Sequence, residues 1–215
     1  MVSFFARQLV RAAMSPRLLV LCGPSGSGKS TLVRRLMDDY ADCFGFSVSH
    51  TTRAPRPGEV DGVHYHFVSR DQMTQAIERG DFLESACFSG NYYGTSKAAV
   101  ARVAAQDRIC VLDIDVQGVR QVRTVPELDP LLVFVKPPTL ESLEQRLRAR
   151  GTETEESLRK RLEAATHELE YGEAPGNFHL IVVNDELETS YTCLRDFLLP
   201  EIQACRKAEK KGLAE

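Results

Sequence analysis

The sequence has no large excess of charge of either sign, no long apolar run and no closely paired cysteines. The 215 residues carry a formal net charge of −3, which does not favour binding to nucleic acid or to a membrane surface. No apolar run approaches the roughly 20 residues that a membrane-spanning helix needs. The six cysteines include no C-x-x-C pair, and Cys22 and Cys110 lie in apolar segments. We therefore expect free thiols in a reducing compartment rather than a disulfide framework or a zinc site.

Acidic residues are also missing from the start of the chain, where the first is Asp38. Residues 1–17 contain Arg7, Arg11 and Arg17 among apolar residues, a composition typical of a mitochondrial transit peptide. A short, partly disordered leader is the alternative. We expect a cytoplasmic protein, with mitochondrial targeting by residues 1–17 as the second hypothesis.

The chain is organised around a phosphate-binding pattern. Leu18 to Cys22 predict a buried strand, Gly23-x-x-x-x-Gly28-Lys29-Ser30 matches the Walker A motif, and apolar residues then recur at helical spacing over 29–39. Such a loop points its N–H groups at phosphate from a helix N-terminus, while Lys29 reaches the β/γ-phosphates and Ser30 can ligate Mg²⁺. The residues expected to bind ATP here are Gly23, Pro24, Ser25, Gly26, Ser27, Gly28, Lys29, Ser30 and Thr31.

Apolar strands alternate with helices along the rest of the chain. Residues 109–115, 131–135 and 180–183 predict buried strands, and residues 139–171 and 186–211 predict helices. This alternation indicates an α/β fold with a mostly parallel sheet flanked by helices. Residues 49–95 look instead like a strand-rich insertion, with strands at 63–68 and 82–88 and a turn at 90–94.

Charged residues fall into three groups that could surround a phosphate. Asp113 and Asp115 end a predicted core strand, where the ligand crevice of an α/β sheet lies, and one of them could hold Mg²⁺ through water. Arg53 and Arg56 lie in a proline-rich loop and suit bidentate capture of a small dianion, with Tyr65 one strand away. The alternatives are a solvent-exposed strand end and a solvated basic loop.

The third group suggests a hinged lid. Arg146 and Arg150 are four residues apart on one predicted helix, and Arg161 lies on the next helix beyond the polar loop 151–157. Closure of such a lid would bring arginines over a transferring phosphoryl group. Ordinary helix-surface charge is the alternative interpretation.

Six stretches together resemble the guanylate kinase family of P-loop nucleoside monophosphate kinases. They are Gly23–Thr31, Phe46–Arg56, Gly80–Glu84, Ser89–Thr95, Leu112–Gly118 and Arg150–Ser157. The resemblance implies a P-loop NTPase fold in which residues 18–211 form the kinase domain. Its core would be 18–48, 96–138 and 168–211, its GMP-binding region 49–95 and its lid about 139–167, with residues 1–17 outside it as a leader.

The resemblance also implies a reaction and its residues. The expected activity is transfer of the ATP γ-phosphoryl group to GMP with Mg²⁺, in purine nucleotide metabolism. The implied catalytic residues are Lys29, Arg56, Arg146, Arg150 and Arg161. Asn184 would lie beside the adenine, and Ser30 and Asp113, the latter through water, would serve the metal. The implied GMP-binding residues are Ser49, Arg53, Arg56, Tyr65, Glu84, Tyr93, Thr95, Asp113 and Asp115.

The sequence leaves some alternatives open. Either Asp113 or Asp115 could serve the metal and the other the guanine. A catalytically inactive guanylate-kinase-like protein-binding module and a kinase for another nucleoside monophosphate are the rival functions. We expect a monomer whose partners are GMP and ATP, and neither nucleic acid nor a membrane.

Overall fold

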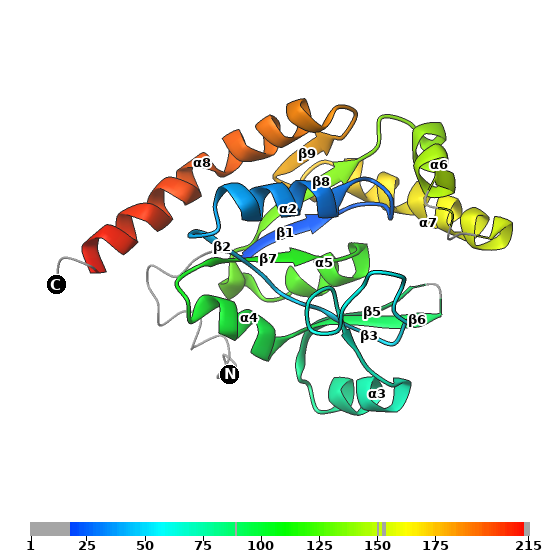
Figure 1. The fold of residues 1–215 in the computed structure, drawn as a ribbon, viewed down its shortest axis with the longest axis horizontal. Coiled ribbons are helices and arrows are strands. Elements are labelled where there is room, and N and C mark those ends of the chain that lie inside the picture. Colours follow the sequence, from blue (N-terminus) through cyan, green and yellow to red (C-terminus); the bar gives the residue numbers. More distant parts are fainter. Residues whose placement is uncertain (1–17, 89, 150, 152–153, 213–215) are drawn as a thin grey trace.

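A five-stranded parallel sheet forms the centre of the protein. The computed structural model describes residues 18–88, 90–149, 151 and 154–212. Strands β1 (Leu18–Cys22), β2 (Phe44–Phe46), β7 (Ile109–Asp113), β8 (Leu131–Lys136) and β9 (Leu180–Val183) lie in the order β2-β7-β1-β8-β9 (Figure 1). Their parallel pairing confirms the predicted α/β fold and brings the carboxyl ends of the strands to one edge.

Helices cover both faces of this sheet because alternate residues of each strand point to opposite sides. Leu19 and Leu21 of β1 pack with α2 (Lys29–Asp39) and α8 (Leu187–Gly212). Leu18 and Val20 pack instead with α4 (Lys97–Ala104), α5 (Val116–Val122) and the second half of α7 (Glu155–Glu173). In the described residues, no helix is long and apolar enough to cross a membrane.

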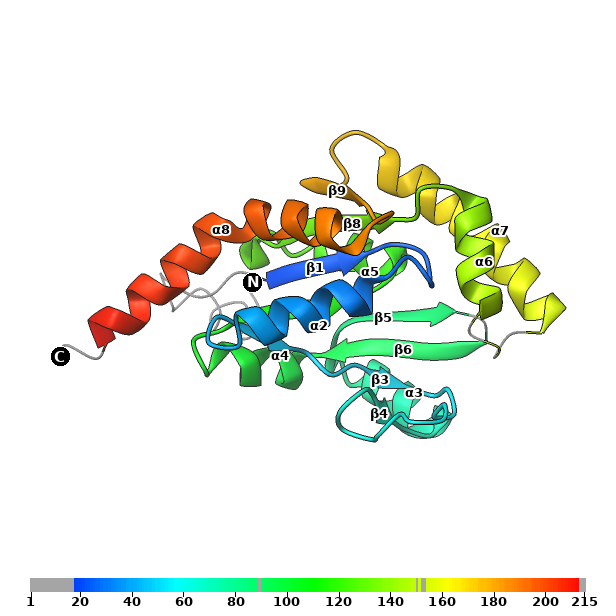
Figure 2. The same ribbon diagram turned by 45° about the horizontal axis from the view of Figure 1, so that its top comes forward.

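A second sheet lies beside the core, with the order β4-β3-β6-β5. It contains β3 (His50–Thr51), β4 (His66–Phe67), β5 (Phe82–Phe88) and β6 (Asn91–Ser96), and α3 (Arg70–Glu78) packs against it (Figure 2). The side chain of Gln121 on α5 joins this sheet to the core. It accepts from the Ser85 N–H at 3.0 Å and donates to the Ser85 carbonyl at 2.7 Å.

Three local predictions were wrong. The expected strand over 63–68 is confined to His66–Phe67, since Val63 and His64 lie in an exposed turn. The expected turn over 90–94 is largely strand β6, because these residues pair with β5 on one side and with β3 on the other. The strand expected to reach Asp115 ends at Asp113, since Asp115 caps helix α5 and accepts from the Gly118 N–H at 3.0 Å.

Two antiparallel helices stand at one end of the molecule. Helix α6 (Leu140–Ala149) packs on the first half of α7 through a separate apolar cluster made by Leu143, Leu147, Leu158 and Ala165. The sequence predicted both helices and their polar connection. The boundaries assigned to the core, the GMP-binding region and the lid remain predictions. A 3₁₀ helix (Pro126–Leu128) precedes β8.

Candidate functional site

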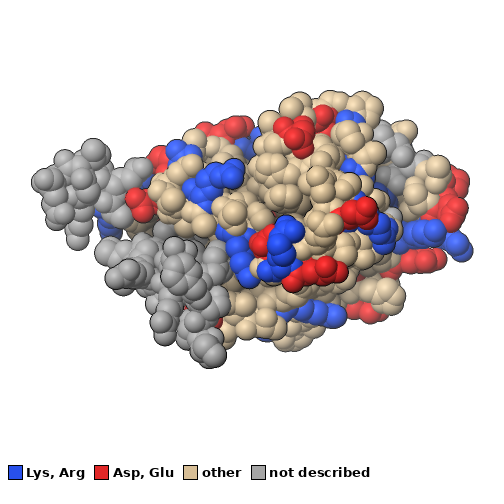
Figure 3. Space-filling view, turned by 90° about the horizontal axis from the view of Figure 1, so that it is seen from below, with Lys and Arg blue, Asp and Glu red and all other residues tan. Residues whose placement is uncertain are grey.

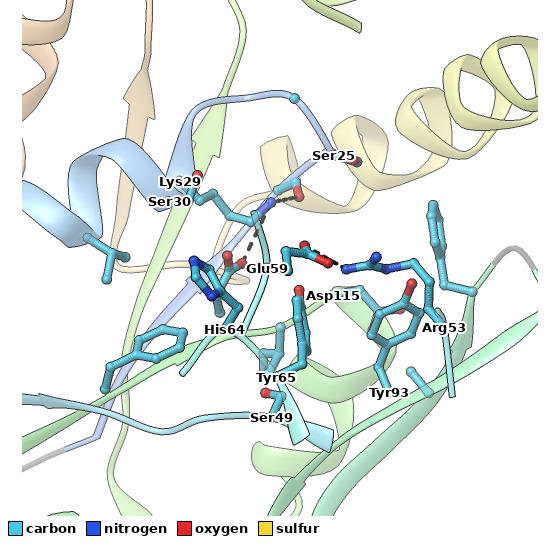
Figure 4. A pocket seen from close by; sticks show the side chains of 18 of the residues that line it. Ser25, Lys29, Ser30, Ser49, Arg53, Glu59, His64, Tyr65, Tyr93 and Asp115 are labelled. Atoms are coloured by element: carbon cyan, nitrogen blue, oxygen red, sulfur yellow. Dashed lines mark hydrogen bonds and ion pairs between the residues drawn. The ribbon is translucent and has the colours of Figure 1, made fainter. Parts of the chain in front are cut away.

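A pocket of about 1100 Å³ opens at the carboxyl ends of the core strands. It is lined by the phosphate loop, by the loop after β3, by the inward face of β5 and by helix α7. In Figure 4, Lys29 and Ser30 approach it from one side, while Ser49, Tyr65 and Tyr93 extend from the opposite side. The pocket therefore joins the two sheets at the edge where an α/β fold binds its ligands.

The backbone of the phosphate loop, residues 23–31, is held in a shape that requires glycine at two positions. Gly23 has φ +140°, and a Cβ there would lie 2.0 Å from the Val135 carbonyl oxygen. Gly28 has φ +94°, and a Cβ there would lie 2.1 Å from Asn184 Nδ2. Asn184 itself donates to the Ser27 carbonyl at 2.7 Å. The loop is thus fixed from behind, which leaves its inner surface open to the pocket.

Lys29 is held at the start of α2 by three oxygen atoms. Its Nζ donates to the carbonyls of Gly23 at 2.6 Å and Pro24 at 3.2 Å, and lies 3.7 Å from Asp113 Oδ1. Burial raises the pKa of Asp113, and the neighbouring ammonium group of Lys29 opposes the rise. A polyphosphate entering the loop would offer Lys29 anionic oxygens in place of these carbonyls.

The arginine loop, the segment after β3 that carries Arg53 and Arg56, is held in shape by Glu59. This carboxylate was not selected from the sequence. Glu59 Oε1 accepts from Arg53 Nη2 at 2.8 Å, and Glu59 Oε2 accepts from the Arg56 N–H at 2.7 Å. The Arg53 guanidinium also lies 5.4 Å from the ring centroid of Tyr65, whose ring meets that of Tyr93 edge to face at 6.1 Å. Arg53, Arg56 and the two tyrosines thus surround one end of the pocket.

Glu84 forms a buried carboxylate in the wall of the pocket. It is 4% exposed and comes from β5, opposite Thr95 of β6. Burial raises the pKa of Glu84 to about 7, and the neighbouring Thr95 opposes the rise. A Cβ on Gly118 would lie 2.6 Å from Glu84 Oε2, so a glycine is needed where α5 approaches this carboxylate. The Thr95 side chain is fully buried beside this carboxylate.

Comparisons with known proteins agree on one family. The guanylate kinase family model matches residues 15–201. A guanylate kinase from Sus scrofa is 56% identical over 198 residues, which make up 92% of this chain and 98% of that protein. A guanylate kinase from Homo sapiens is 54% identical over 197 residues, with the same coverage of 92% and 98%.

The chain belongs to the guanylate kinase family. The crystal structure of a guanylate kinase from Anaplasma phagocytophilum has a TM-score of 0.69 and 28% sequence identity, and the match covers 90% of each chain. The P-loop NTPase fold expected from the sequence is therefore confirmed. The chain is an enzyme, a guanylate kinase, and its relatives do not favour the inactive-module alternative.

Most residues selected from the sequence come together at the pocket of this guanylate kinase. Residues that line it include Lys29, Ser30, Ser49, Arg53, Arg56, Tyr65, Glu84, Tyr93, Asp113, Asp115 and Arg161. Thr95 is buried beside Glu84, while Asn184 lies behind the loop. The individual roles of these residues stay predictions.

Two of the three arginines assigned to the predicted lid, Arg146 and Arg161, contact different parts of the protein. Arg161 Nη1 donates to Ser25 Oγ at 3.0 Å, so α7 already contacts the phosphate loop. Arg146 Nη2 donates to the Asn184 carbonyl at 2.8 Å and lies outside the residues that line the pocket. Arg150 lies outside the described residues. Arg146 and Arg161 therefore contact different residues, and only Arg161 lines the pocket.

Sequence reasoning missed several residues that line the pocket, among them Glu59, Phe88 and Glu168. Glu59 follows Arg56 by three residues in the same loop, and that opposite charge could have indicated an internal pair. Glu168 follows Arg161 by seven residues, about two helical turns, so both were predictable on one face of α7. Burial raises the pKa of Glu168 to about 7, and its Oε2 has no hydrogen-bond partner among the described residues.

Proposed function

We propose that this guanylate kinase binds the phosphates of ATP on residues 23–31 and GMP between Glu84 and the arginine loop. One observation carries this proposal: cations from three separate elements and a buried carboxylate line a single pocket. Lys29 comes from the phosphate loop, Arg53 from the loop after β3 and Arg161 from α7. In Figure 4, Lys29 and Arg53 approach the same space from different elements. Two nucleotides would then meet through their phosphates, with the bases at opposite ends.

Mg²⁺ bound with ATP fits the residues at this site. The described residues contain no group of three His, Cys, Asp or Glu side chains close enough to hold a metal by themselves. Mg²⁺ commonly keeps several waters and binds through one or two carboxylates together with substrate phosphates. The Ser30 hydroxyl and, through water, Asp113 or Asp115 would hold it. When bound, the ion neutralises charge on the β- and γ-phosphates.

The residues of the pocket would then reduce the repulsion between two anions. The acceptor oxygen belongs to a phosphate whose second pKa is about 6, so no general base is needed to generate the nucleophile. Lys29 would turn from the Gly23 and Pro24 carbonyls toward the ATP phosphates, while Arg53 and Arg56 hold the GMP phosphate. Arg161 would stabilise the negative charge that develops during transfer. Arginines in this role increase the rate roughly 10³–10⁵-fold.

The buried carboxylate of Glu84 would select the base. Guanine presents N1–H and its 2-amino group side by side, so one carboxylate accepts both hydrogen bonds. Adenine presents an acceptor at the equivalent position, which would leave the buried carboxylate unpaired. Sites built on such hydrogen bonds can discriminate against the wrong substrate by a factor of roughly 10⁴–10⁵ in kcat/KM. Thr95 and either Asp113 or Asp115 would complete this end of the pocket.

A coupled assay of ADP release tests the proposal. We expect turnover that depends on GMP and Mg²⁺, with AMP and UMP far poorer acceptors. Replacing Lys29 by methionine should reduce kcat by at least about 10²-fold while GMP still binds, since the variant lacks the charge that meets the ATP phosphates. Lys160→Met is the control, because Lys160 is 58% exposed and pairs with Glu156 on the outside of α7. Equal activity of the two variants would remove Lys29 from the mechanism.

The cellular location, the oligomeric state and the partners of the enzyme are also proposals. A cytoplasmic location agrees with the free state of all six cysteines, and a monomer is proposed from the resemblance alone. On the face seen in Figure 3, basic and acidic side chains are interspersed. That mixed distribution favours small-molecule substrates over nucleic acid as the partner. Residues 1–17, on which the mitochondrial alternative depends, lie outside the described residues.

A further inference from the structure

Arg161 of helix α7 contacts two separate parts of the pocket, the phosphate loop and the second sheet. On one side, its guanidinium donates to Ser25 of the phosphate loop at 3.0 Å. On the other side, its Cζ lies over the ring of Phe88, 5.8 Å from the ring centroid. Phe88 is the last residue of β5, in the second sheet, so one guanidinium from α7 contacts both the ATP side and the GMP side of the pocket.

The strand that carries Phe88 also carries Glu84. Residues 84, 86 and 88 alternate onto one face of β5, and all three line the pocket. At about 3.3 Å per residue, Phe88 lies roughly 13 Å along the strand from Glu84. A rigid strand thus connects the carboxylate proposed to hold guanine with the ring that meets Arg161. The end of β5 approaches the paired helices α6 and α7 in Figure 2.

Ordinary core packing does not account for this ring. Phe88 belongs to none of the three apolar clusters formed by the described residues. A cation over an aromatic face is attracted to the ring, and more strongly where both groups are partly removed from water. Together with the hydrogen bond to Ser25, this attraction favours one arrangement of the Arg161 side chain.

We propose that Phe88 is a positioning residue for phosphoryl transfer, because its ring holds the Arg161 guanidinium against the phosphate loop. This inference rests on the proposed role of Arg161 at the transferring phosphoryl group. Because β5 also carries Glu84, a movement of this strand on GMP binding would move the ring as well. Phe88 therefore links the state of the GMP side to the alignment of the arginine.

A double-mutant cycle tests this role through kcat and KM. Phe88→Leu keeps an apolar side chain but removes the aromatic face, and should lower kcat about 5- to 30-fold, as expected for a loss near 1–2 kcal/mol. The KM values for ATP and GMP should change less than about twofold, since the contact acts on the transferring group. Phe88→Tyr should restore most of the activity because it restores the ring.

The second arm of the cycle uses Arg161→Ala, assayed at high enzyme concentration. In that background Phe88→Leu should cause no further loss of kcat, because the ring has no guanidinium to position. Phe82→Leu is the matched control because it also removes a ring from β5. The Phe82 ring contacts the His50 ring, with 5.3 Å between their centroids, and not Arg161. Its effect should be the same with or without Arg161.

Several results would overturn the proposal. The first is an equal loss of kcat from Phe88→Leu in both Arg161 backgrounds, and the second is failure of Phe88→Tyr to restore activity. A rise in both KM values without a change in kcat would show a purely structural role. If Phe88→Leu melts below the assay temperature, Phe88→Met replaces it in the cycle. Failure of the wild-type enzyme to show GMP-dependent ADP release would instead refute the proposed function itself.

Discussion

Replacing Glu168 by glutamine should stabilise the folded enzyme, and by more at pH 8 than at pH 5.5. Glu168 lies on α7 in the wall of the pocket, and its Oε2 atom is buried without a hydrogen-bond partner among the described residues. Burial raises the pKa of this carboxyl from 4.5 to about 7, Lys29 and Arg161 oppose the rise, and Asp115 and Asp113 add to it. Glutamine keeps the shape of the side chain without its charge.

The size and sign of the effect follow from proton linkage. The folded protein binds the Glu168 proton more tightly than the unfolded chain does, because burial disfavours the charged form. The stability that this neutral carboxyl contributes is fully present below about pH 4.5 and is lost as the pH rises through about 7. The raised pKa of Glu168 should therefore lower the free energy of unfolding by about 1 kcal/mol at pH 5.5 and by about 3 kcal/mol at pH 8, relative to a neutral side chain.

Urea denaturation of the nucleotide-free and metal-free protein measures this difference. With a slope near 2 kcal/mol/M, Glu168→Gln should raise the unfolding midpoint by roughly 1.5 M at pH 8 and by less than half of that at pH 5.5. Glu170→Gln is the control because Glu170 is 71% exposed on the same helix, and its effect should stay within about 0.5 kcal/mol. Equal effects of Glu168→Gln at both pH values, or a loss of stability at both, would refute the reasoning.

Two further substitutions address the GMP side of the pocket. Glu84→Gln should lower the preference for GMP over AMP in kcat/KM by at least about 10²-fold while phosphate binding changes little, because an amide no longer accepts both guanine hydrogen bonds. An equal loss for every monophosphate would remove Glu84 from base selection. Glu59→Gln should raise the KM for GMP about tenfold and leave the KM for ATP unchanged, since Arg53 loses the carboxylate that orients it. A lower KM for GMP would show that Glu59 competes with the substrate phosphate.

Short contiguous patterns explain why much of the fold was predictable. The strand 18–22, the glycines of the loop and the helix from Lys29 follow one another directly, and local backbone geometry requires that order. The helix after Ser69 was also predictable, since Ser69 and Gln72 form a capping box within four residues. Strand β6 was not predictable, because its conformation depends on pairing with two other strands. Strand β3 is distant in the sequence, and β5 is separated from β6 by a turn.

The sequence by itself determined the phosphate loop, the alternation of strands and helices, and the residue types able to bind two phosphorylated ligands. These features depend on neighbouring residues, so periodicity and motif spacing reveal them. Only the tertiary structure decided which charges meet. Glu59 orients Arg53, Arg146 contacts the Asn184 carbonyl, and Arg161 lies between Ser25 and Phe88. Such contacts join residues far apart in the chain or across a folded loop, and their distances are fixed only once the core has packed.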